Sequence, residues 1–231
     1  MEYFSEFLWE KNARETNEDS LVIRQVIVNG HPLVMAVVCD GIASLPWGEM
    51  ASSYVVSCLK AIVEDIAGGS RPNLRRIRHG LSRQLYSCHR LLNERGMGTT
   101  VCLAVIYKNR ELLMQSGDSR IYVGSLKLKP VTRDHSDERG RLTRAIGVGE
   151  YKKIFSESRI FRKNEVLLLC SDGFYRRNEK LIENFAHNCR CETEEEYKGK
   201  LYEIYNHGVA NGEKDNCSAV VIWRKKDGRK T

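Results

Sequence analysis

The stretch Val34-Met35-Ala36-Val37-Val38-Cys39-Asp40-Gly41 decides how this chain folds. It opens with an unbroken apolar run, and a short apolar run that ends at a turn-forming Asp-Gly pair is typical of a buried strand. The stretch Val166-Leu167-Leu168-Leu169-Cys170-Ser171-Asp172-Gly173 has the same form in the second half of the chain. Together they predict two buried strands that each carry a carboxylate at the tip.

A third acidic residue lies beside another apolar segment, because Asp215 and Asn216 come shortly before the run 219–223. Carboxylates that meet in one place repel one another unless a cation neutralises them. Oxygen ligands favour Mg²⁺ or Mn²⁺, whereas zinc and copper sites usually recruit His and Cys. The sequence thus predicts a divalent-metal site and favours hydrolysis as its use.

The first half of the chain is predicted to contain a hairpin followed by two long helices. Asn29-Gly30 is a strong hairpin signal and separates strand-like runs at 21–28 and 33–39, so these strands should be antiparallel neighbours. Apolar residues then recur at helical spacing over 47–66 and 72–93. This order favours sheets with helices packed outside them.

Short β-rich runs follow the helices at 99–107, 111–116 and 120–123, and we expect them to form a meander. Farther along, Thr193 and Glu196 have the spacing of a capping box. The remaining predicted elements are a strand at 166–171, a helix near 179–188, a helix that begins after Thr193 and a strand at 217–223.

The composition predicts one domain, because no Pro/Gly/Ser-rich linker divides the 231 residues. We expect that domain over 1–224 and a short basic tail over 225–231. The net charge of +7 and the pI near 9.0 arise from Lys and Arg residues dispersed among acids, which favours a solvated surface over a nucleic-acid-binding one. No apolar run is long enough to span a membrane, and the first residues lack the apolar region of a secretory signal.

Most of the eight cysteines lie in apolar segments, where free thiols pack as small hydrophobic side chains. This predicts a reducing, cytoplasmic location. Cys189 and Cys191 lack a second Cys or His pair at zinc-site spacing, so we interpret them as loop cysteines.

Nine short segments, taken in order, resemble the protein phosphatase 2C (PP2C, PPM) family of metal-dependent protein serine/threonine phosphatases, in its short bacterial form. Each segment is weak alone, but their common order is specific and covers nearly the whole chain. The segments are Arg14-x-x-Asn17-Glu18-Asp19-Ser20, Val38-Cys39-Asp40-Gly41, Gly48-Glu49-x-Ala51-Ser52, Gly98-Thr99-Thr100, Gly117-Asp118-Ser119-Arg120, Thr132-x-Asp134-His135-Ser136, Leu142-Thr143-Arg144-Ala145-Ile146-Gly147, Cys170-Ser171-Asp172-Gly173 and Asp215-Asn216.

The resemblance implies an α+β fold, a four-layer α-β-β-α sandwich of two mainly antiparallel sheets flanked by helices. It also implies hydrolysis of phosphoserine and phosphothreonine in proteins by a water activated at a binuclear Mn²⁺ or Mg²⁺ centre, with a third ion that binds more weakly. By this resemblance Asp40 bridges the two ions, the Gly41 carbonyl binds one of them, and Asp172 and Asp215 complete the shell of the other.

The resemblance assigns four further residues. Asp19, preferred here over Glu18, holds metal-bound water, and Asp118 reaches the third ion. Arg14 clamps the phosphate, for which a planar guanidinium offers bidentate donors that lysine lacks.

A flap that is longer in bacterial relatives is shortened here to residues 137–141.

Other residues of these segments have structural interpretations. We expect His135 to bond the backbone of its loop, Thr99 and Thr100 to pack near the site, and Asp134 and Asp137 to be turn residues.

The expected partners are phosphoproteins, the substrates of a bacterial serine/threonine kinase, and we expect a cytoplasmic monomer that binds no nucleic acid. The alternative is a catalytically weak phosphoprotein-binding regulatory module with the same fold. The complete acidic set favours the enzyme. A nucleic-acid-binding function rests on net charge alone and has no motif behind it.

Overall fold

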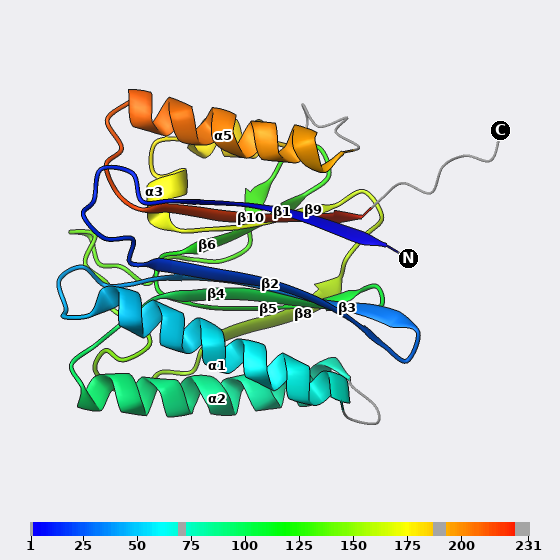
Figure 1. The fold of residues 1–231 in the computed structure, drawn as a ribbon, viewed down its shortest axis with the longest axis horizontal. Helices are drawn as coiled ribbons and strands as arrows, with labels where there is room; N and C mark the ends of the chain where they lie inside the picture. Colours follow the sequence, from blue (N-terminus) through cyan, green and yellow to red (C-terminus); the bar gives the residue numbers. More distant parts are fainter. Residues whose placement is uncertain (1, 69–72, 187–192, 225–231) are drawn as a thin grey trace.

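Two antiparallel sheets stacked face to face form the centre of the protein, with helices on both outer faces (Figure 1). This computed structural model describes residues 2–68, 73–186 and 193–224. In spatial order, the strands of the first sheet are β1 (Tyr3–Glu10), β10 (Cys217–Arg224), β9 (Val166–Cys170), β6 (Arg120–Gly124) and β7 (Lys129–Pro130). Those of the second sheet are β2 (Asp19–Val28), β3 (His31–Asp40), β4 (Val101–Tyr107), β5 (Arg110–Ser116) and β8 (Phe155–Ile160).

The helices divide between the two outer faces. In Figure 1, α1 (Gly48–Gly68) and α2 (Leu74–Glu94) cover the second sheet, below, and α5 (Glu194–Ala210) covers the first, above. The short helices α3 (Asp172–Tyr175) and α4 (Glu179–Asn184) contribute side chains to the same apolar cluster as α5. The fold is therefore the predicted four-layer α-β-β-α sandwich.

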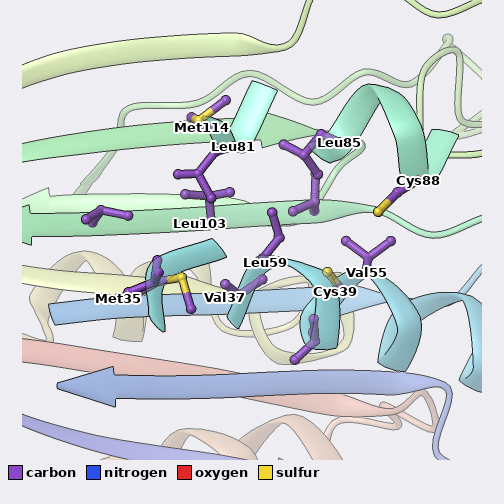
Figure 2. Close-up of a cluster of buried hydrophobic side chains, with 14 of the residues drawn as sticks. Met35, Val37, Cys39, Val55, Leu59, Leu81, Leu85, Cys88, Leu103 and Met114 are labelled. Carbon is purple, nitrogen blue, oxygen red and sulfur yellow. The ribbon is translucent and has the colours of Figure 1, made fainter. Parts of the chain in front are cut away.

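Strand β3 shows how alternation builds these layers. Val34, Ala36 and Val38 point toward the first sheet, where they join the cluster between the sheets. Met35, Val37 and Cys39 point the other way and pack against Leu59 and Leu85 of the two long helices (Figure 2). All the β3 residues from Leu33 to Cys39 are fully buried, which explains the continuous apolar run.

The hairpin between β2 and β3 forms as predicted. Asn29 and Gly30 have φ values of 50° and 72°, the left-handed conformations that a tight two-residue hairpin turn requires. The register pairs Val28 with His31 at the turn and Asp19 with Asp40 at the other end. The capping box at the start of α5 is also confirmed, since Glu196 N–H donates to Thr193 Oγ1 and Thr193 N–H to the Glu196 side chain.

The predicted meander is wrong. Strands β4 and β5 pair with each other, but β6 belongs to the opposite sheet, where its neighbours are β9 and β7. The chain changes sheets at Gly117, whose φ of 114° is unfavourable for any residue with a Cβ atom. The apolar pattern of β6 fits either sheet, so the sequence alone did not identify its partner.

The strands β1, β7 and β8 and the helix α3 were not predicted. Strand β1 lies at the edge of its sheet, where β10 is its one partner among the described strands, and it exposes half of Phe7 and Trp9. Its glutamates are compatible with this exposed edge, and they interrupt the apolar pattern by which a strand is predicted. Strand β8 is likewise a polar edge strand, beside β5.

The described cysteines are free thiols, which agrees with the sequence. No helix in the described ranges is both long and apolar enough to cross a membrane. The predicted tail at 225–231, together with Cys189 and Cys191, lies outside the described residues.

Candidate metal centre

Asp19 and Asp40 stand side by side because β2 and β3 pair in a register that sets them directly opposite each other. Both positions continue the alternation that points Leu21 and Val38 between the two sheets. Asp19 is almost completely buried, with 1% of its surface exposed. The hairpin thus places two carboxylates at the end of the inter-sheet layer.

Ser171 connects this pair to the opposite sheet. Its hydroxyl donates to Asp19 Oδ2 at 2.8 Å, and the backbone N–H of Ser218 donates to the same hydroxyl at 3.0 Å. The other carboxylate oxygen of Asp19, Oδ1, is buried and has no hydrogen-bond partner among the described residues. A buried acceptor without a partner is costly, and a cation would satisfy it.

Two threonines hold the backbone of Asp40. Thr100 Oγ1 accepts from the Asp40 N–H at 3.0 Å and bonds the Ser119 hydroxyl at 2.7 Å. Thr99 Oγ1 donates to the Asp40 carbonyl oxygen at 2.9 Å. The two threonines therefore position the tip of β3, which is a more specific role than the packing that we expected.

Gly41 lies where no side chain fits. A Cβ atom there would stand 2.4 Å from the Gly48 carbonyl oxygen and 2.8 Å from that of Glu18. The Gly41 N–H donates to the same Glu18 carbonyl at 3.1 Å. The Glu18 side chain itself turns toward Gly48 at the start of α1, so it is Asp19 that accompanies Asp40 between the sheets.

Asp172 and Asp215 approach from the first sheet and both contact arginines. Asp172 follows β9 as the first residue of α3, and its Oδ2 accepts from Arg176 one turn later. Asp215 precedes β10, and its Oδ1 lies 2.9 Å from Nη2 of Arg14. Asn216 anchors the neighbouring loop, since its Oδ1 accepts from the Glu18 N–H at 2.9 Å.

Asp118 belongs to the same end of the molecule. Its carbonyl oxygen accepts from the Tyr175 hydroxyl at 3.1 Å, and burial raises the pKa of its carboxyl group. The effect of Asp134 on that pKa has the same direction, whereas Arg176 lowers it. The first sheet therefore brings Asp118 within electrostatic reach of the other acids.

Two of the three predictions for the loop residues 134–137 are confirmed. His135 bonds the backbone as predicted, because its Nδ1 accepts from the Gly117 N–H at 3.1 Å. Asp137 caps its turn by accepting from the N–H groups of Arg139 and Arg141, both at 2.9 Å. The interpretation of Asp134 as a turn residue is wrong.

Asp134 is a partner of Arg120, not a turn residue. The Arg120 Nε and Nη2 atoms donate to its two carboxylate oxygens at 2.9 and 2.8 Å. The Arg120 guanidinium also lies 3.8 Å from the centre of the Tyr175 ring. Bidentate geometry of this kind depends on how distant segments fold together, so the local sequence gave no sign of it.

The acids raise one another's affinity for protons. Burial raises the pKa of Asp19 to about 6 and that of Asp172 to about 7. The pKa of Asp40 is raised well above its ordinary value, first by burial and then by the charges of Asp19, Asp172 and Asp118. Such a cluster holds its negative charge near neutral pH only when a cation compensates it.

The donor chemistry fits a hard divalent ion. The cluster offers carboxylate oxygens, and one of them, Asp19 Oδ1, is buried and has no hydrogen-bond partner in the described part of the chain. In the part of the chain that the structure describes, no group of three or more His, Cys, Asp or Glu side chains is arranged to hold an ion as it stands. Arg14 and Arg176, which are bonded to Asp215 and Asp172, have to share these acids with any ion that binds.

Two charged residues of this region were missed from the sequence. Arg176 contacts Asp172 and lies 3.5 Å from Glu213, which is buried just ahead of Asp215. The spacing of four residues between Asp172 and Arg176 was a usable signal, because such pairs share a helix face. Glu213 offered no comparable signal, since its burial depends on the packing of the loop before β10.

A basic groove lies elsewhere on the molecule. It has a volume of about 620 Å³ and is lined by Arg75 and Arg78 of α2, by Lys108 of the turn between β4 and β5, and by Arg110 at the start of β5. That turn lies at the opposite end of β4 from Thr100. The groove is therefore separate from the carboxylates.

The family model for protein phosphatase 2C matches residues 12–206. The chain belongs to the protein phosphatase 2C family. Comparison with curated protein sequences finds no significant match.

Solved structures share the PP2C fold over nearly the whole chain. The serine/threonine phosphatase of S. agalactiae matches with a TM-score of 0.80 at 18% identity, covering 97% of this chain and 100% of that one. Stp1 from Staphylococcus aureus matches with a TM-score of 0.81 at 19% identity, covering 98% and 96%. PppA from Pseudomonas aeruginosa, a regulatory component of T6SS, matches with a TM-score of 0.77 at 24% identity, covering 96% and 97%.

Proposed function

We propose that this PP2C protein hydrolyses phosphoserine and phosphothreonine in proteins. The observation that carries the proposal is that Asp19 and Asp40 from one sheet lie within electrostatic reach of Asp172 and Asp215 from the other, in a chain that belongs to this family. Two Mn²⁺ or Mg²⁺ ions bound there would activate water and neutralise the phosphate. The proposed domain is 1–224.

In this proposal Asp40 would help to hold both ions, and the Gly41 carbonyl would help to hold one of them. The threonine bonds to the Asp40 backbone support this role, because they hold the carboxylate in place without occupying its oxygens. Asp172 and Asp215 contribute oxygens from the opposite sheet. Asp19 accepts a hydrogen bond from Ser171 on one oxygen, which leaves its other oxygen for water or for an ion.

We assign phosphate binding to Arg14. Its side chain is 44% exposed, and it contacts Asp215 through a single nitrogen, Nη2. A guanidinium has five N–H donors in a fixed fork, so this contact leaves others for the oxygens of a phosphate. Asp215 would thus orient Arg14 at the edge of the centre.

The proposed substrates are phosphoproteins made by a bacterial serine/threonine kinase, and the proposed location is the cytoplasm. The tight turn at 137–141, in place of a long flap, supports access of a free phosphopeptide to such a centre. We propose that the protein acts as a monomer.

The test is hydrolysis of an aryl phosphate, a phosphothreonine peptide and a phosphotyrosine peptide, each with Mn²⁺ and with EDTA. We expect turnover that depends on Mn²⁺ and favours phosphothreonine over phosphotyrosine. Asp40→Asn should reduce the rate by about a hundredfold or more, because it removes a carboxylate that would hold both of the ions that activate the water. Asp137→Asn is the matched control, since it removes a carboxylate from a surface turn.

Turnover that persists in EDTA, or an Asp40→Asn variant as fast as the wild type, would exclude the proposed mechanism. Tight binding of the phosphothreonine peptide without turnover would instead favour the regulatory alternative, a catalytically weak phosphoprotein-binding module. Binding is measured by fluorescence anisotropy of the labelled peptide.

A further inference from the structure

Arg176 places a positive charge inside the carboxylate cluster. It follows α3, and its backbone N–H donates to the Asp172 carbonyl oxygen at 2.9 Å. Its guanidinium contacts the Asp172 carboxylate through Nη2. Its Nη1 lies 3.5 Å from Glu213 Oε1 and 3.8 Å from Asp215 Oδ2. One arginine thus contacts three acids, two of which are proposed metal ligands.

Glu213 strengthens this arrangement. Its side chain is only 5% exposed, and Oε1 accepts from the N–H groups of Lys214 and Asp215 at 3.0 and 3.1 Å. Its Oε2 is buried and has no hydrogen-bond partner among the described residues. A buried carboxylate needs a compensating charge, and Arg176 supplies it.

The two halves of the cluster differ in whether their acids have basic partners. Arg14 and Arg176 neutralise the acids that come from the first sheet, Asp172 and Asp215. On the side of the second sheet, no recorded ion pair joins Asp19 or Asp40 to a basic side chain of the described ranges. Positive charge is therefore already present where one ion would bind and missing where the other would.

We propose that Arg176 is an internal competitor of the divalent metal. While the metal is absent, Arg176 pairs with the Asp172 carboxylate and so stabilises the metal-free protein. When an ion binds, this ion pair has to break, so Arg176 lowers the affinity for the metal. This inference rests on the proposed function, because it presupposes that Asp172 is a ligand. It goes further by identifying the residue that limits how tightly the ion is held.

The physical reason is electrostatic. A guanidinium within about 4 Å of the ligand oxygens repels an incoming divalent cation and competes for the same lone pairs. The Arg176 side chain is 45% exposed, so water screens part of this repulsion. Its removal should tighten Mn²⁺ binding by about five- to tenfold, the range expected for a screened unit charge.

The test is titration calorimetry of the full chain with Mn²⁺. We expect Arg176→Met to bind Mn²⁺ about five- to tenfold more tightly than the wild type. Arg176→Lys retains the charge and should stay within about twofold to threefold of the wild type. Arg177→Met is the matched control, because Arg177 is the adjacent exposed arginine and should leave the affinity unchanged.

Thermal unfolding supplies a second readout that does not depend on activity. In EDTA, Arg176→Met should unfold at a lower temperature than the wild type, because the acids then lack their counter-charge. Saturating Mn²⁺ should raise its Tm by more than it raises that of the wild type. An arginine that only fastened the loop would lower the Tm in both conditions and would not tighten Mn²⁺ binding.

Three results would overturn the inference. Equal or weaker Mn²⁺ binding by Arg176→Met, with the wild type binding normally, would contradict the competition and leave the proposed function standing. A higher KM for the phosphothreonine peptide with unchanged Mn²⁺ binding would assign Arg176 to the substrate phosphate. If neither the wild type nor Arg176→Met bound Mn²⁺, the metal centre itself would be wrong, and the inference would fall with it.

Discussion

Single hydroxyl groups hold the end of β3 that carries Asp40. The hydroxyl of Thr100 lies between the Asp40 N–H and the Ser119 hydroxyl, and the side chains of Thr100 and Ser119 are buried. Because the side chain of Asp40 follows its backbone, the loss of this acceptor should displace the carboxylate as well as leave a buried N–H without a partner. Thr100 is therefore a positioning residue for the proposed centre.

We expect Thr100→Val to reduce the free energy of unfolding by about 1–3 kcal/mol, the cost of a buried donor that loses its acceptor. It should also weaken Mn²⁺ binding, measured by titration calorimetry. The control is Thr132→Val, since Thr132 Oγ1 accepts from the buried Ile121 N–H at 3.0 Å in the same way. That variant should lose comparable stability with unchanged Mn²⁺ affinity. Equal effects on Mn²⁺ binding in both variants would refute the positioning role.

At the scale of elements, the edge strand β8 depends on a buried charge. Glu111 of β5 is completely buried, and its partner Arg159 of β8 lies across the strand pair, with Nε 2.9 Å from Glu111 Oε1. Arg159 also donates to Glu165 at 2.8 Å. Burial raises the pKa of Glu111 to about 7, although Arg159 opposes this shift.

Arg159→Met should therefore destabilise the protein by about 3 kcal/mol at pH 8, because it leaves a buried carboxylate without a partner. The loss should be smaller at pH 6, where Glu111 is mostly protonated and needs no counter-charge. Urea unfolding at pH 8 and pH 6 measures the loss in free energy of unfolding at each pH. Arg162→Met is the control, because Arg162 is 78% exposed and contacts the same Glu165; it should cost less than about 1 kcal/mol. A loss independent of pH would contradict this account.

At the scale of the whole molecule, the acids join the two halves of the sandwich. Asp19 lies in one sheet and Ser171, its hydrogen-bond donor, follows a strand of the other. The metal-free protein therefore concentrates negative charge at a junction that its fold depends on. Its stability should accordingly vary with pH.

The direction of that dependence follows from the raised pKa values. The pKa of Asp19 is about 6 and that of Asp172 about 7, against 3.8 ordinarily. Between about pH 4 and 7 the folded protein binds more protons than the unfolded chain, so the free energy of unfolding falls as pH rises. In EDTA we expect the Tm to be roughly 3–8 °C lower at pH 8 than at pH 5.

Glu111 titrates in the same window, so Glu111→Gln measures its share of the effect. Saturating Mn²⁺ at pH 8 should restore the lost Tm, because a bound ion replaces the protons as counter-charge. A Tm that rises with pH in EDTA would show that the acids are not held at raised pKa values.

The sequence by itself determined the elements whose signals are local. The apolar run before Asp40, the Asn29-Gly30 turn and the Thr193 cap each predicted their structure correctly, because alternation, turn conformation and capping depend only on residues close in the chain. The order of the family segments predicted which acids would form the metal site, and that prediction is the basis of the proposed function.

Only the tertiary structure decided which sheet received β6, how Asp134 and Arg120 pair, and that Arg176 contacts Asp172 together with Glu213. Each of these depends on contacts between segments far apart in sequence. The apolar face of β6 could pack in either sheet. The residues next to Arg176 in the sequence do not indicate that it contacts a buried carboxylate. The physical reason is that burial and charge compensation are properties of the packed molecule, whereas sequence patterns report only local geometry.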